Sequence, residues 1–334
     1  MSMELPFDNP LFLPTGRSLP KPTPVEDGGP PEARDAYDFR DARIVAAVNV
    51  ALAARRPLLV TGDPGSGKST LARAVAREKR WTYLETVVTS RTEIGDLTAG
   101  FDAVRRLADA QIPRRLLPDW TYVEPGVLWW AFAPETAPYR GHDPATELEE
   151  HQQKRLPPVV DPRVPGDSRD SVVLIDEIDK AEPDLPNDLL QPLDQQGFTT
   201  REAGWIAAAH DVFVIITSNG ERRLPPAFLR RCVQLHVEAS DPDFYEAVAT
   251  AHFGARTDGL FADVAAQHLA FRTAAAQRNR RMPSTAEFLD TVRACLRYGQ
   301  RPGSEGWNAI VEAALWKEPA LPRADGGDGA GPAP

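Results

Sequence analysis

A short glycine-rich stretch carries the strongest chemical signal in this sequence. Residues 62–69 read GDPGSGKS and fit the pattern G-x-x-x-x-G-K-[ST]. Glycines let backbone N–H groups turn toward phosphate oxygens, and the helix that follows directs its positive end at the same anion. Lys68 can then reach the β and γ phosphates, and the Ser69 hydroxyl can bind Mg²⁺. We predict a nucleotide site made by Gly62, Asp63, Pro64, Gly65, Ser66, Gly67, Lys68, Ser69 and Thr70.

Two carboxylates follow an apolar run further along the chain. Residues 171–177 read SVVLIDE, which predicts a buried strand that ends in Asp176 and Glu177. Adjacent acids after a strand are commonly only a solvated turn, but the phosphate loop upstream favours a functional pair. Asp176 is then expected to hold Mg²⁺, and Glu177 to take a proton from an attacking water. A kinase does not need a residue in the role of Glu177, whereas a hydrolase does.

Polar residues also follow the next predicted strand. Asn219 ends the run VFVIITSN, where its amide can orient the attacking water or merely cap a turn. Arg230 and Arg231 close a short predicted helix before the last strand. They are either a plain surface pair or an arginine finger, which stabilises transition-state charge on the nucleotide of a neighbouring subunit.

The elements that must position these residues alternate along the first two thirds of the chain. Apolar runs predict strands at 57–61, 82–88, 171–175, 212–217 and 232–237. Helical spacing is found between them at 41–54, 69–79, 179–195 (interrupted near Pro186) and 226–231. Such alternation is typical of a parallel α/β sheet covered on both faces. Beyond residue 241 only helices are expected, at 243–253, 259–277, 284–298 and 307–316. We therefore predict an α/β domain over 35–240 and an all-helical domain over 241–318.

Three segments do not fit this alternation. Residues 1–34 are proline-rich and predict an extended arm; a loose tail is favoured over an arm anchored by Phe7, Leu11, Phe12 and Leu13. Residues 134–170 form a long polar insertion, in which a solvated charged helix is favoured over a site. Residues 319–334 are rich in Gly, Pro and Ala and predict a disordered tail.

Composition narrows the class of protein. The chain has 334 residues and a formal charge of −10, which argues against a surface that coats nucleic acid or an anionic membrane. Two cysteines cannot make a disulfide framework, and no Cys/His cluster has zinc-ligand spacing. The first twenty residues have prolines and acids where a secretory signal needs an apolar run, and no apolar run is long enough to span a bilayer. We expect a protein without a membrane span that acts in the cytoplasm.

Taken together, the motifs GDPGSGKST, VLIDEIDK, IITSN and LPPAFLRRC resemble those of AAA+ ATPases in order and spacing. Two further stretches resemble features of the MoxR-type branch: residues 120–130 its helix-2 insert, and residues 195–211 the hairpin before the sensor strand. The resemblance covers residues 35–317. It implies a P-loop NTPase fold, with a five-stranded parallel sheet of order 5-1-4-3-2 and a small all-α lid.

The resemblance also implies an activity and its parts. Such proteins hydrolyse ATP with Mg²⁺ between the subunits of a ring, usually a hexamer, and remodel partners in the manner of chaperones. Lys68 and Ser69 would bind phosphate and Mg²⁺, Asp176 would be the Walker B metal residue, and Glu177 the catalytic base. Asn219 would be sensor 1, and Arg231 the finger, with Arg230 the near alternative. The implied client is a protein that bears a von Willebrand factor A domain.

One departure concerns sensor 2. The family often has an arginine at the start of the third lid helix, where this sequence has Thr285. Arg280 and Arg281 lie nearby and are candidate replacements. Two other functions stay open: a nucleotide-dependent switch with low turnover in a signalling or defence complex, and a motor on nucleic acid. The lid arginines motivate the motor, while the net charge and the absence of a base-reading motif argue against it.

Overall fold

The computed structural model describes residues 9–14, 37, 39, 41–112, 116–141, 168–237, 242–278 and 280–315. The chain divides into two compact units, Met1–Ala255 and Arg256–Pro334. The helical domain was expected to begin at residue 241, and the domain boundaries given above stay predictions. The charged segment inside the 134–170 insertion and the tail at 319–334 lie outside the described residues, as does most of the N-terminal arm.

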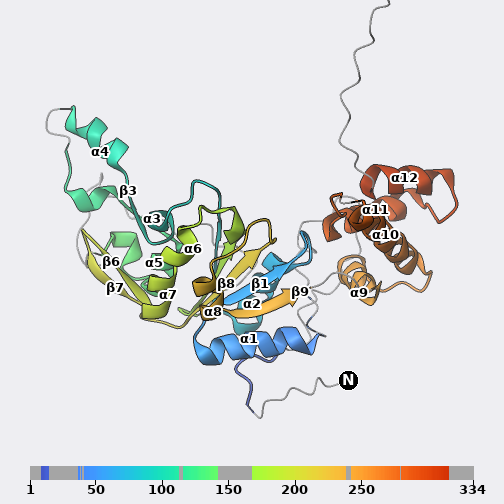
Figure 1. The fold of residues 1–334 in the computed structure, drawn as a ribbon, viewed down its shortest axis with the longest axis horizontal. Helices are drawn as coiled ribbons and strands as arrows, with labels where there is room; N and C mark the ends of the chain where they lie inside the picture. Colours follow the sequence, from blue (N-terminus) through green and yellow to red (C-terminus); the bar gives the residue numbers. More distant parts are fainter. Residues whose placement is uncertain are drawn as a thin grey trace, which may run out of the picture. The chain divides into compact units, whose positions relative to one another are not determined.

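The first unit is built on a five-stranded parallel sheet (Figure 1). Its strands stand in the order β2-β5-β8-β1-β9. Numbered along the chain among themselves, they have the predicted order 5-1-4-3-2, and the predicted α/β P-loop fold is confirmed. The strands are β1 (Leu58–Gly62), β2 (Thr82–Val87), β5 (Ser171–Asp176), β8 (Val212–Ser218) and β9 (Val233–Val237).

Both faces of the sheet are covered, which explains why its strands read as continuous apolar runs. Along β5, Val172 and Leu174 pack into the cluster beneath α1 (Ala42–Ala54) and α2 (Lys68–Lys79). Val173 and Ile175 point to the other face, into a cluster with α5 (Val127–Phe132). Other helices of this unit are α3 (Ile94–Leu97), η3 (Ala137–Tyr139), η5 (Ile178–Lys180), α6 (Leu185–Asp188), α7 (Leu190–Gln195), α8 (Pro226–Arg231) and α9 (Pro242–Phe253).

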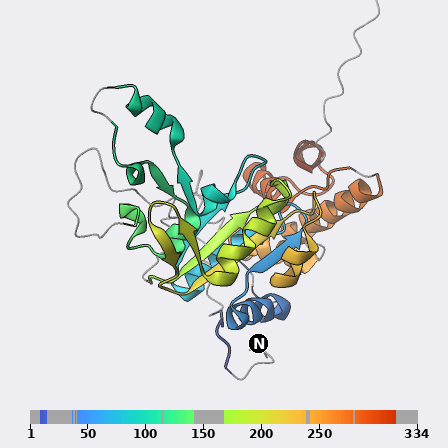
Figure 2. The ribbon, with the colours of Figure 1, turned by 60° about the vertical axis from the view of Figure 1, so that its left-hand side comes forward.

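Two antiparallel hairpins interrupt the α/β alternation. The first pairs β3 (Ala99–Phe101) with β4 (Val123–Pro125), and carries α4 (Ala103–Ala110) and η2 (Asp119–Tyr122) between them. Its helical tip projects away from the sheet in both views (Figures 1 and 2). The second hairpin pairs β6 (Gly197–Thr200) with β7 (Gly204–Ala207), inside the stretch that resembles a pre-sensor hairpin.

The N-terminal segment corrects one expectation. Phe12 is 2% exposed and packs edge-to-face on Phe39, so the arm is anchored at this residue and the favoured loose tail is wrong there. The Asn49 side-chain amide forms two hydrogen bonds with the backbone of Phe12, accepting from its N–H at 2.8 Å and donating to its carbonyl at 2.7 Å. Burying these groups without partners would be costly, and the side-chain amide removes that cost. Leu11 and Leu13 stay exposed.

In its described residues, the second unit contains three helices, α10 (Leu260–Gln277), α11 (Thr285–Tyr298) and α12 (Glu305–Leu315). Helix α11 begins with a capping box, in which Ser284 and Glu287 satisfy each other's backbone N–H groups. It ends at Gly299, whose left-handed conformation glycine adopts without strain. In the part of the chain that the structure describes, no helix has the length and apolar character needed to cross a bilayer.

Candidate active site

The phosphate loop joins β1 to α2 at the carboxyl edge of the sheet. Gly62 has φ of +149°, and a Cβ there would lie 2.2 Å from the Val237 carbonyl oxygen, so a larger residue would force β9 away. Gly67 has φ of +88° and immediately precedes the first residue of α2. The Lys68 ammonium folds back over the loop and donates to the carbonyl oxygens of Gly62, at 2.9 Å, and Asp63, at 2.8 Å. The sequence-predicted loop thus has the geometry of an anion cradle.

The electrostatics of this loop suit a phosphate. Burial lowers the pKa of Lys68, while the carboxylates of Asp176 and Asp179 act in the opposite direction. Lys68 forms no ion pair with a described carboxylate, so no direct partner within the described chain neutralises its charge. The Ser66 hydroxyl is buried and has no hydrogen-bond partner among the described residues. An anionic ligand with several acceptor oxygens would satisfy both groups.

Asp176 and Ser69 meet at the same edge. The Ser69 hydroxyl donates to the Asp176 carboxylate, with oxygen–oxygen distances of 2.8 and 3.0 Å, and the Thr217 hydroxyl donates to the same carboxylate. Hydroxyl and carboxylate oxygens are the donors that Mg²⁺ prefers, and Mg²⁺ commonly takes its remaining ligands from water and substrate phosphates. The donor set therefore fits the predicted metal.

Glu177 lies one residue beyond Asp176 and is held by three groups. Its backbone is left-handed, at φ 61° and ψ 46°, and its N–H donates to the Thr217 hydroxyl at 2.9 Å. On the side chain, Oε1 accepts from Asn219 Nδ2 at 3.2 Å and Oε2 accepts from Lys180 Nζ at 2.6 Å. The structure therefore brings together Glu177 and Asn219, which sequence reasoning singled out from different strands.

Asp179 organises the loop that carries Asn219. Its carboxylate is buried and accepts from the backbone N–H groups of Asn219, at 3.1 and 3.3 Å, and Glu221, at 2.9 Å. A buried acceptor of two backbone donors fixes the turn after β8, and with it the direction of the Asn219 amide. Asp179 acts through Asn219 and is a positioning residue.

The two candidate finger arginines lie apart from this network, at the end of α8. Both side chains are exposed. Arg231 Nε donates to the Asp194 carboxylate at 2.8 Å, in an ion pair that is about half exposed on both sides. Solvent screening leaves such a pair weak, so it holds Arg231 loosely. No contact within the described chain brings either arginine to the phosphate loop.

The sensor 2 region belongs to the second unit. Thr285 is buried at the start of α11, next to its capping box. The Arg281 guanidinium pairs with the Glu287 carboxylate at 2.9 Å, so this candidate replacement also supports the helix cap.

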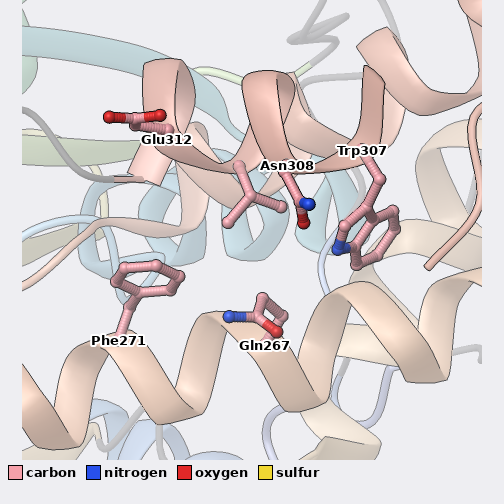
Figure 3. A pocket seen from close by; sticks show the side chains of 6 residues that line it. Gln267, Phe271, Trp307, Asn308 and Glu312 are labelled. Atoms are coloured by element: carbon pink, nitrogen blue, oxygen red, sulfur yellow. The ribbon is translucent and has the colours of Figure 1, made fainter. Parts of the chain in front are cut away.

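A hollow of about 360 Å³ lies between α10 and α12 in the same unit. The side chains of Phe271 and Gln267 face those of Trp307 and Asn308 across it (Figure 3). Val311 and Glu312 complete the lining. None of the residues predicted as site residues lies in this hollow.

The sequence analysis did not single out three residues that hydrogen-bond to Asp176, Glu177 or Asn219 at the strand ends: Thr217, Asp179 and Lys180. Thr217 could have been found from the sheet, since Ile175 and Ile216 are partners in the β5–β8 register and the residues that follow them lie side by side. Asp179 and Lys180 belong to the motif DEIDK but were not assigned a role, because only the turn after β5 brings them back toward the strand ends.

The comparison with protein-family models agrees with this architecture. A family model described as AAA domain (dynein-related subfamily) matches residues 57–232, which is 176 of the 334 residues. The chain is also similar to the solved structure of NtrX from Brucella abortus in complex with ATP, at 13% identity and a TM-score of 0.41, covering 80% of this chain and 53% of that one. For NtrX in complex with ADP the values are 12%, 0.45, 88% and 59%. The chain thus spans a little over half the length of these structures. A search of curated proteins found no match.

Proposed function

This chain belongs to the AAA domain family, dynein-related subfamily, and from that premise we propose that it hydrolyses ATP with Mg²⁺ to drive a conformational change in a partner protein. One observation carries the proposal. The cradle around Lys68, the Ser69–Asp176 pair and the Glu177–Asn219 pair all lie at the carboxyl edge of one parallel sheet. Ligands of open α/β sheets bind at this edge.

Each residue has a role in this reaction. The loop N–H groups and Lys68 would hold the β and γ phosphates, and Ser69 and Asp176 would hold the metal. Bound Mg²⁺ would neutralise developing charge on the phosphate oxygens. Asn219 orients the attacking water, and Glu177 accepts its proton as the water oxygen bonds to the γ phosphorus and the bond to the β-phosphate oxygen breaks. The products are ADP and inorganic phosphate.

The finer assignment rests on the sequence resemblance. We propose that the chain belongs to the MoxR-type branch, acts in the cytoplasm and forms a ring, with Arg231 or Arg230 reaching the nucleotide of a neighbour. The exposed position of both arginines at the end of α8 is consistent with action on another subunit. The client proposed from the resemblance is a protein with a von Willebrand factor A domain.

The test is the Glu177→Gln variant. We expect ATP binding to be retained, and turnover to fall at least about a hundredfold, the usual contribution of a positioned general base. Binding is measured with a fluorescent ATP analogue and turnover by phosphate release. Turnover in Glu177→Gln equal to that of the wild type would refute the assigned base.

A titration of protein concentration tests the ring. If a neighbour supplies the finger, activity per protomer rises with concentration, and it collapses in either Arg231→Ala or Arg230→Ala while ATP binding is kept. Activity that is independent of concentration, and unchanged in both variants, would refute a finger supplied by another subunit.

A further inference from the structure

The base carboxylate of the proposed hydrolysis is engaged on both of its oxygens. Asn219 Nδ2 donates to Oε1 at 3.2 Å, and Lys180 Nζ donates to Oε2 at 2.6 Å. The contact with Lys180 is the shorter of the two and joins opposite charges, so it is the stronger restraint on the direction of the carboxylate.

The Glu177 backbone has little freedom to move. Its left-handed conformation and the hydrogen bond from its N–H to Thr217 fix the start of η5. Asn219 is fixed as well, since Asp179 accepts from its backbone N–H. Any change in where the Glu177 carboxylate points must therefore come from its own side-chain rotation and from the Lys180 side chain.

Lys180 has a side chain that is well suited to leaving this group. Its side chain is 41% exposed, against 28% for Glu177, and it has a flexible four-carbon stem. The carboxylates of Asp179 and Glu221 also lie within its electrostatic reach, and Glu221 is exposed. The ammonium therefore has other acidic neighbours within the first unit when it leaves Glu177.

We propose that Lys180 is a latch on Glu177: the ion pair directs Oε2 toward the ammonium, and it must open before the carboxylate can take the proton of the attacking water. This inference rests on the proposed function and assigns a restraint to the same site. Because Lys180 is reachable from solvent, an acidic side chain presented by a bound partner protein can compete for it and release the base. Lys180 is a positioning residue in this scheme, since it acts through Glu177.

The test compares three variants at saturating ATP. Lys180→Met removes the charge and keeps the length of the stem, so we expect kcat to rise about two- to fivefold with KM unchanged, as suits a partly exposed ion pair. Lys180→Arg keeps the pair and should stay close to the wild type. Lys79→Met is the matched control, because Lys79 contacts the Leu11 carbonyl and the Trp81 ring instead of the site. Its kcat should be unchanged.

Salt supplies a second measurement. Added salt screens a partly exposed pair, so the rise in kcat from Lys180→Met should shrink as the salt concentration increases. An unchanged or lowered kcat in Lys180→Met, with thermal unfolding like that of the wild type, would overturn the latch. A rise in kcat in Lys180→Arg as large as that in Lys180→Met would overturn it as well, because the arginine keeps the charge.

The failure of the latch can be told apart from the failure of the proposed function. Loss of ATP binding in Lys68→Ala tests the nucleotide site independently of Lys180. If wild-type turnover is too slow to follow in the steady state, a single turnover of bound ATP is compared. The latch then predicts a gain in Lys180→Met that disappears in the double variant with Glu177→Gln, and no gain refutes it.

Discussion

The strand-edge site of the first unit and the hollow between α10 and α12 of the second differ in how their polar groups are held. At the strand edge, the side chains of Asp176, Glu177 and Asp179 each accept at least two hydrogen bonds from neighbouring elements. Across the hollow, the side chains of Gln267, Asn308 and Glu312 form no hydrogen bond with another described residue (Figure 3).

This difference indicates where chemistry can be done. Polar groups accelerate a reaction when surrounding structure already orients them toward the charge that develops. At the strand edge, several neighbouring elements orient the polar side chains. In the hollow, a bound ligand would itself have to order the side-chain amides. We therefore place function at the strand edge and treat the hollow as a consequence of packing between two helices.

The largest expected effect comes from the phosphate loop. Lys68→Ala should lower kcat/KM for ATP about a thousandfold, which corresponds to about 4 kcal/mol, because the variant removes a cation aimed at the phosphates. Lys79→Ala, at the other end of the same helix, should leave kcat/KM within a factor of two. Phosphate release at low ATP measures both. An equally large loss in Glu312→Ala would break the contrast between the two regions.

The next effect concerns the hollow itself. Trp307 is 5% exposed, so Trp307→Ala should cost about 3 kcal/mol of stability, mostly through lost burial and the cavity left behind. Amide hydrogen exchange would locate the loss in α10 and α12, with protection of the central strands kept. Asn308→Ala, at an exposed position, should stay within about 0.5 kcal/mol of the wild type. Equal deprotection of β5 and β8 would contradict this prediction.

The Asp179→Ala variant should lose less stability than Trp307→Ala, and yet its turnover should fall. In Asp179→Ala the N–H groups of Asn219 and Glu221 lose their acceptor, which should lower the free energy of unfolding by about 1–3 kcal/mol. Turnover should fall about tenfold or more, since the Asn219 amide is no longer directed at the site. Asp179→Asn keeps one acceptor oxygen and should be intermediate in both urea unfolding and phosphate release. Full turnover in Asp179→Ala would show that Asn219 needs no such support.

The smallest expected effect is a pH dependence of stability that arises in the second unit. Burial, helped by the charge of Arg272, lowers the pKa of His268 to about 4, against an ordinary 6.5. The folded state thus keeps this imidazole neutral while the unfolded chain binds a proton. The resulting stability is complete above pH 6.5 and is lost as pH falls toward 4.

Between pH 7 and pH 5 we expect His268 to account for a loss of about 1–2 kcal/mol. Urea unfolding of the wild type and of His268→Gln at both pH values isolates this share, because the other titrating groups are common to the two proteins. Equal losses in wild type and variant would refute it.

Several features could be predicted from local sequence alone. The phosphate loop depends on glycines and a lysine within eight consecutive positions, and β5 with its terminal acids depends on five apolar or small residues followed by Asp176 and Glu177. The five strands were predictable because sheets covered on both faces leave long apolar runs. The position of Asn219 after β8 made it a candidate for the site, with a turn cap as the alternative, and the structure brings its side-chain amide to Glu177.

Other features depended on the three-dimensional structure because their partners are far apart in the chain. Phe12 is anchored by Asn49, which lies 37 positions away on α1 and whose side-chain amide hydrogen-bonds to the Phe12 backbone. Thr217 reaches Asp176 only through the parallel register of β5 and β8. Lys180 turns back onto Glu177 only because the chain takes a left-handed step after the strand. Residue types and spacing thus determined which reactive groups this protein has, and the tertiary structure decided which other groups hold them in place, since hydrogen bonds between distant segments leave no local pattern.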